Sequence, residues 1–194
     1  MTWKDIKLAT LQKMFSANGS EIPDDGSCDD YLAAMPYVAN EALAMLATAG
    51  RYLIKTVAIT HDGTNKKYDL NTIATDYYDI DHVTYANGTI YREFVRYAME
   101  NDNIVLYNCP AGTYTVFYKA YPQTITTETL DTYVLPLQQE VVVLIPLYMA
   151  SQLYKDDDNS IATTYRNEFE VGFERLNKLI SDSSKEFVSE SGWI

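Results

Sequence analysis

Apolar residues recur every three or four positions in the first fifty residues of the chain, with polar residues between them. Thr2 and Asp5 have the spacing of a capping box, and the apolar run behind them predicts a helix over residues 3–18. A second run with the same period predicts a helix over residues 30–49. Pro36 lies inside this run, so we expect either a kink there or a helix that begins near Pro36.

From Tyr52 the helical period gives way to alternation, and β-branched and aromatic residues become frequent. Asn87-Gly88 is a strong signal for a two-residue turn, because a type I′ turn needs two residues at positive φ. We therefore expect a hairpin over residues 80–93. Further turn signals rich in Asn, Gly and Pro follow, and together they predict a meander of about four to six short strands.

The helical period returns after a Thr-rich connector. Over residues 137–152 the apolar side chains cover nearly every face, which predicts a helix that is buried on several sides and kinked at Pro146. Residues 159–181 carry a single apolar stripe and predict an amphipathic helix. The stretch after it is a polar tail.

These elements predict an α+β protein: a four-helix bundle interrupted by an inserted small antiparallel β domain, with an extended C-terminal tail. The helices of the bundle occupy residues 1–50 and 130–182, the β domain residues 51–129, and the tail residues 183–194. The chain shows no internal repeat.

Composition narrows the possible functions. Of the 194 residues 47% are hydrophobic, which is enough for a core, and the net charge of −12 without a basic cluster argues against gripping a phosphate backbone. The longest nearly uncharged apolar stretch, residues 141–150, is about half of the roughly 20 residues that a membrane span needs. No secretory signal opens the sequence, so we expect a cytosolic protein with Cys28 and Cys109 as free thiols.

Candidate catalytic residues are few. His61 lies in a predicted turn and His82 in a predicted strand, and no nucleophile or phosphate-loop motif accompanies either of them. We expect both histidines to be structural and the protein to have no enzymatic activity and no cofactor.

The acidic run Asp156-Asp157-Asp158 imitates the opening of an EF-hand calcium loop. The sixth and twelfth positions of that loop would be Ile161 and Asn167, where the motif needs Gly and Glu. We expect the acids to cap a helix, since carboxylates at a helix N-terminus accept its free N–H groups.

Tyrosine is abundant, with 17 copies in the chain. Its ring can stack on sugars or bury area at protein interfaces, and composition leaves both uses open. Packing of a half-buried sheet accounts for about half of the tyrosines. The strand positions are Tyr85, Tyr91, Tyr97, Tyr114 and Tyr118.

Three segments of the helical part have residue patterns that can be compared with those of known proteins. They are Ala39-Asn40-Glu41-Ala42, the run from Pro146-Leu147-Tyr148 to Lys155-Asp156-Asp157, and Tyr165-Arg166-Asn167-Glu168-Phe169-Glu170. In these segments the chain resembles the head-tail connector, or adaptor, proteins of tailed bacteriophages. The sheet between the helix pairs resembles versions of these adaptors that carry an inserted sheet.

The resemblance implies a structural adaptor that forms a homo-oligomeric ring, usually a dodecamer, docks on the portal vertex and connects the DNA-filled head to the tail. The implied partners are the portal protein, neighbouring copies and tail or tail-completion proteins, in the virion neck after assembly in the host cytoplasm. DNA would pass through without specific binding, because twelve copies at −12 each carry about −144 and repel the duplex. The alternative is a carbohydrate-binding tail or baseplate module that uses the tyrosine-rich sheet.

Two groups of residues are candidates for contacts in such a ring. The polar tail carries two apolar pairs, which we expect to bind the portal or a neighbouring subunit. These pairs are Phe187-Val188 and Trp193-Ile194. The densest acidic loop holds the candidates for lumen-facing carboxylates. Its acids are Asp24, Asp25, Asp29 and Asp30.

Overall fold

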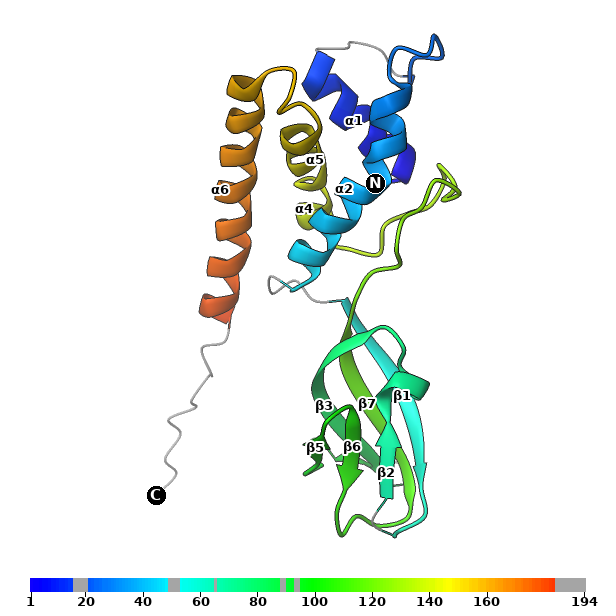
Figure 1. The fold of residues 1–194 in the computed structure, drawn as a ribbon. Coiled ribbons are helices and arrows are strands. Elements are labelled where there is room, and N and C mark those ends of the chain that lie inside the picture. Colours follow the sequence, from blue (N-terminus) through cyan, green and yellow to red (C-terminus); the bar gives the residue numbers. More distant parts are fainter. Residues whose placement is uncertain (16–20, 49–52, 65, 88–89, 93–94, 184–194) are drawn as a thin grey trace. The chain divides into compact units, whose positions relative to one another are not determined.

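The computed structural model of the chain divides into two compact units (Figure 1). We call Met1–Arg51 together with Thr124–Ile194 the helical unit, and Tyr52–Gln123 the sheet unit. The residues that the structure describes are 1–15, 21–48, 53–64, 66–87, 90–92 and 95–183. Among them, no helix combines the length and the apolar character needed to cross a membrane.

The helical unit is built around one short apolar helix. Its elements are α1 (Trp3–Phe15), α2 (Asp29–Thr48), α4 (Gln139–Val142), α5 (Ile145–Leu153) and α6 (Asn159–Ser183). Helices α1, α2 and α6 all pack against α5, and their buried side chains form a common core. Most residues of α5 are buried, which confirms the prediction of a helix covered on several sides.

The start of α1 is the predicted capping box. The backbone N–H of Thr2 donates to Asp5 Oδ2 at 2.8 Å, and the backbone N–H of Asp5 donates to Thr2 Oγ1 at 3.2 Å. The first of these hydrogen bonds lowers the pKa of Asp5. Helix α2 begins at Asp29 and runs through Pro36, so the alternative of a start near Pro36 is wrong.

The segment predicted as one kinked helix over residues 137–152 is two helices. Helix α4 ends at Val142, and α5 starts at Ile145 after a tight turn in which the N–H of Leu144 donates to the carbonyl of Val141. Pro146 then lies in the first turn of α5, where a residue without an N–H and with φ near −65° is well accommodated. The proline therefore marks a helix start rather than a kink.

The sheet unit contains two antiparallel sheets in its described part. Its elements are β1 (Leu53–His61), β2 (Lys66–Asp69), α3 (Leu70–Ile73), β3 (Tyr77–Asn87), β4 (Ile90–Arg92), β5 (Ala98–Glu100), β6 (Asn103–Leu106) and β7 (Gly112–Ala120). The strand orders are β1-β7-β3-β4 and β2-β6-β5. Inward side chains of both sheets share one core, with Val83, Tyr114 and Val116 from the first and Ile104 and Leu106 from the second.

The predicted meander is wrong, because β7 lies between β1 and β3. Every second residue of β7 from Tyr114 onward is buried, so this strand fits the centre of the sheet better than an edge. The hairpin over residues 80–93 is confirmed as the antiparallel pair of β3 and β4. Asn87 pairs with Ile90 and therefore belongs to β3, whereas the sequence had placed it in the turn; Gly88 lies outside the described residues.

The connector after the sheet unit is bound to α2 by a side-chain clamp. Asn40 Nδ2 donates to the carbonyl of Ile125 and the N–H of Ile125 donates to Asn40 Oδ1, both at 2.8 Å. The Ile125 side chain is 1% exposed and belongs to the helical core. This contact explains why the helical unit resumes at Thr124, before the position of 130 expected from the sequence.

Replacing Asn40 with Ala should lower the free energy of unfolding by about 1–3 kcal/mol, because two hydrogen bonds are lost and the backbone groups of Ile125 are left without their partner. Urea unfolding followed by far-ultraviolet circular dichroism measures this change. Ala44→Ser, on the exposed side of α2, is the control and should stay within about 0.5 kcal/mol of the parent chain. Equal stability of the two variants would contradict the role of the clamp.

Candidate functional site

The three segments that carry the resemblance to head-tail adaptors, around Glu41, Tyr148 and Arg166, meet where α2, α5 and α6 pack. Tyr148 donates its hydroxyl hydrogen to Glu41 Oε2 at 3.1 Å, and its ring meets that of Phe169 edge-on with 5.1 Å between centroids. The guanidinium of Arg166 lies 5.4 Å from the Tyr148 ring centroid, and Arg166 Nε donates to Glu170 Oε1 at 2.7 Å. Residues far apart in the chain thus form one aromatic and charged cluster.

The electrostatics of this cluster are those of a structural contact. Burial, and then the hydrogen bond to Glu41, raise the pKa of Tyr148, so its hydroxyl stays protonated and remains a donor. The hydrogen bond to Glu170 raises the pKa of Arg166. Tyr165 extends the contact to α1 by donating to the carbonyl of Lys13 at 2.7 Å. Tyr148 and Tyr165 thus fix α5 against α2 and α6 against α1, whereas the Arg166–Glu170 pair lies within α6.

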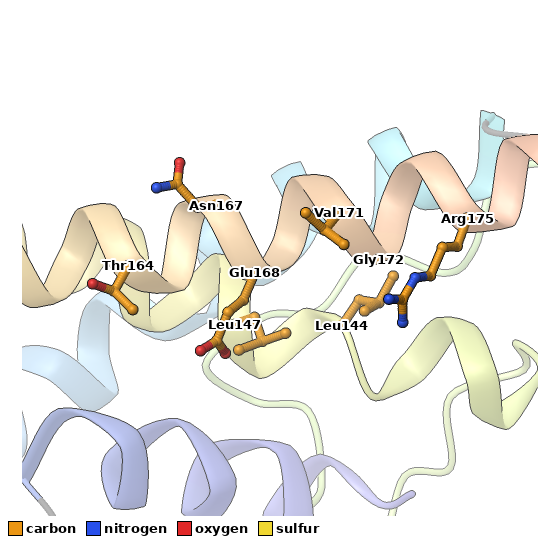
Figure 2. A pocket seen from close by; sticks show the side chains of 8 residues that line it. All are labelled: Leu144, Leu147, Thr164, Asn167, Glu168, Val171, Gly172 and Arg175. Atoms are coloured by element: carbon orange, nitrogen blue, oxygen red, sulfur yellow. The ribbon is translucent and has the colours of Figure 1, made fainter.

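A groove of about 540 Å³ runs along α6 beside the α4–α5 junction (Figure 2). Leu144 and Leu147 line it from the junction and the first turn of α5. The lining residues of α6 are spaced by three or one positions, which places them along one side of the helix. They are Thr164, Asn167, Glu168, Val171, Gly172 and Arg175.

Gly172 allows α6 to approach the α4–α5 junction closely. A Cβ at this position would lie 2.5 Å from Leu144 Cδ2, so only a residue without a side chain fits against Leu144 as it is placed. The Leu144 side chain is 9% exposed, whereas Val171 at the edge is 52% exposed. Figure 2 shows Glu168 with Leu147 toward one end of the groove and Arg175 with Leu144 toward the other. The groove thus has an apolar centre between opposite charges.

The family model described as SU10 adaptor protein matches residues 1–188. The chain belongs to the SU10 adaptor family. This is a family of bacteriophage head-tail adaptors, so the adaptor is a structural component of the virion that contacts other head or tail proteins. No curated protein matches the chain. Membership in a family of structural proteins fits the prediction that this chain is not an enzyme.

The acidic loop of the adaptor leads into α2, and all four of its carboxylates are exposed. Asp25 Oδ1 accepts hydrogen bonds from the Ser27 hydroxyl at 2.5 Å and from the Ser27 N–H at 3.0 Å, and these bonds lower the pKa of Asp25. Asp29 and Asp30 occupy the first turn of α2, where they oppose the positive end of the helix dipole. The lumen-facing role of Asp24, Asp25, Asp29 and Asp30 stays a prediction.

The acidic run before α6 caps this helix through Asp158, as predicted. Asp158 Oδ1 accepts from the N–H groups of Ser160 at 2.9 Å and Ile161 at 3.1 Å. Asp157 Oδ2 accepts from the Tyr31 hydroxyl at 2.5 Å, and this hydrogen bond raises the pKa of Tyr31 to about 12. The run therefore ties the start of α6 to α2.

Both histidines of the adaptor are placed by aromatic neighbours. His61 is buried, with Nδ1 2.9 Å from the Tyr68 hydroxyl and its ring edge-on to Tyr114. His82 stacks on Phe117 at 4.2 Å between centroids, with Nδ1 2.7 Å from an oxygen of Asp81. These contacts pack both rings against aromatic side chains of the sheet unit, and the structural role of the two histidines stays a prediction. Cys28 and Cys109 are both free.

The tail residues proposed as partner-binding lie outside the described residues. They are Phe187, Val188, Trp193 and Ile194. The groove at Gly172 is the surface that the sequence reasoning missed. The sequence did contain one signal for this groove, namely Val171 beside Gly172 within an amphipathic helix. That Leu144 lies opposite Gly172, however, depends on the tertiary structure.

The strand tyrosines are used for packing where their side chains are described. Tyr114 and Tyr118 are buried, Tyr85 is half-buried, and the Tyr91 side chain lies outside the described residues. Tyr97 is half-buried as well, but it lies just before β5 and not in a strand, so its predicted strand position is wrong. Tyr114 is 0% exposed, stacks on Tyr85 with 4.7 Å between centroids, and donates to the carbonyl of Pro110 at 2.8 Å. The buried rings of Tyr114 and Tyr118 are therefore not available for stacking on a sugar.

Replacing Tyr114 with Phe should make the adaptor less sensitive to alkali. Burial raises the pKa of Tyr114 to about 12 from its ordinary value of 10.0, so its stabilisation is complete below pH 10 and is lost as the pH rises through about 12. The parent chain should lose up to about 2–3 kcal/mol more than Tyr114→Phe between these pH values. Urea unfolding at a series of pH values measures the two slopes. Parallel slopes would contradict the raised pKa.

Replacing Gly172 with Val should lower the free energy of unfolding by about 1–3 kcal/mol, because the new side chain displaces Leu144. In a Leu144→Ala background the same substitution should cost clearly less, since the clashing atoms are gone. Val171→Ala is the neighbouring control and should change the stability by about 0.5 kcal/mol or less. Chemical unfolding of the parent chain, the two single variants and the double variant gives the coupling energy; a coupling energy of zero would exclude the Gly172–Leu144 contact as the origin of the loss.

Proposed function

We propose that the adaptor forms a ring of twelve copies that docks on the portal vertex and connects the DNA-filled head to the tail. The observation that carries this proposal is the family match over residues 1–188. In the ring, α1, α2, α5 and α6 act as the four-helix bundle expected from the sequence. The ring belongs to the virion neck and assembles in the host cytoplasm.

Exposed apolar side chains on the helical unit support an assembling protein. A closed ring needs two different patches on each subunit, because each copy contacts its two neighbours through unlike surfaces. Tyr37 on α2 is 73% exposed, as is Leu130 in the connector, and Val171 lies at the edge of the groove on α6. Apolar side chains left in water on separate parts of one unit are available for such contacts.

The charge of the adaptor supports a DNA conduit. With a net charge of −12 per copy, a ring surrounds its channel with carboxylates that repel the phosphate backbone, so the duplex passes without adhering. Within this proposal the exposed acidic loop at residues 24–30 faces the lumen. The apolar pairs of the tail bind the portal or a neighbouring subunit, and tail-completion proteins bind the opposite side of the ring.

Light scattering after size-exclusion chromatography tests the assembly. With the portal protein of the same phage present, the adaptor should elute with it, and the adaptor part of the complex should have a mass of about 264 kDa, twelve times 22.0 kDa. Deleting residues 187–194 should abolish this association while the circular dichroism spectrum keeps its helical signal. An adaptor that stays monomeric and separates from the portal at every concentration would overturn the proposal.

A further inference from the structure

We propose that Phe187 and Val188 of one copy occupy the Gly172 groove of a neighbouring copy, an inference that rests on the proposed ring. Leu144 and Leu147 form the apolar part of this open groove, and its volume of about 540 Å³ lies within the range found for ligand-binding clefts. An aromatic and a branched aliphatic side chain match this apolar centre in chemistry.

The sequence around the apolar pair complements the charges of the groove. Lys185 precedes Phe187-Val188, and Glu190 follows it. The groove has Glu168 toward one end and Arg175 toward the other. A segment that runs parallel to α6 therefore brings Lys185 toward Glu168 and Glu190 toward Arg175, with the apolar pair between them.

The spans of the two elements agree with this alignment. Arg175 lies seven positions after Glu168, which is about 10 Å along the helix axis. Glu190 lies five positions after Lys185, which is about 17 Å in an extended chain. All four charged side chains are long enough to cover the difference while the chain crosses the groove obliquely.

The length of the chain favours a second copy as the acceptor of the segment. Helix α6 ends at Ser183, which lies eleven residues and therefore about 16 Å beyond Gly172 along the axis. The four residues from Ser183 to Phe187 extend by at most about 14 Å, and the chain would also have to reverse its direction. To approach the centre of the groove of its own subunit, Phe187 would need a full reversal of the chain at full extension while α6 keeps its observed end. Insertion into the next subunit gives the unlike contact surfaces that a ring needs.

Disulfide trapping in the full chain tests this placement. Val171→Cys and Val188→Cys are combined with Cys28→Ala and Cys109→Ala, and the ring is oxidised with and without portal protein. We expect a ladder of covalent dimers, trimers and higher species on non-reducing gels. Ile161→Cys with Val188→Cys is the matched control, because Ile161 lies on α6 outside the groove, and it should give at least tenfold less cross-linked product.

The outcomes separate this inference from the proposed function. A cross-linked monomer would mean docking within one subunit and would overturn the inference. A ring of the expected mass without the Val171–Val188 cross-link would also overturn it, while the adaptor function stands. If neither ring formation nor portal binding occurs, the proposed function fails and the inference fails with it.

A charge exchange tests the same contact without engineered cysteines. Arg175→Glu and Glu190→Arg should each weaken subunit association by about threefold to tenfold at low salt, and the double variant should recover to within about twofold of the parent chain. Arg175→Glu combined with Glu186→Arg is the control and should not recover. Sedimentation across a concentration series measures association; a double variant no better than the single ones would contradict the alignment.

Discussion

The burial of α5 constrains the whole helical unit. This nine-residue helix is apolar on nearly every face, so it is stable in water only when other elements cover it. Helices α1, α2 and α6 supply that cover. Because all three contact the same short helix, the capped start of α1, the passage of α2 through Pro36 and the approach of α6 at Gly172 are parts of one packing arrangement.

Polar contacts then decide how the covering helices are oriented. Apolar burial is non-directional, whereas the hydrogen bond of Tyr148 to Glu41 and that of Tyr165 to the carbonyl of Lys13 each require one relative position. The residues that resemble the adaptor family are largely the residues that make these contacts. The segments that resemble the adaptor family contain no catalytic motif, and their residues hold the helices together. This suits a protein whose function is assembly.

Local patterns predicted local structure well. The capping box at Thr2 and Asp5, the capping by Asp158 and the pairing of β3 with β4 each involve residues close in sequence, and each is confirmed. The errors have a common origin. Two features were predicted wrongly: the break between α4 and α5, and the position of β7 between β1 and β3. Both depend on which distant segment covers each face, and the hydrophobic period is the same whichever segment does so.

By itself, the sequence determined the alternation of helical and strand segments, the acidic character of the chain and its family, because period, composition and motif are properties of neighbouring residues. Only the tertiary structure decided that Asn40 clamps Ile125 across 85 residues, and that Gly172 faces Leu144 to form a groove. The physical reason is that such contacts arise from the docking of whole elements, and a stripe of apolar residues specifies that a face must be buried without specifying its partner.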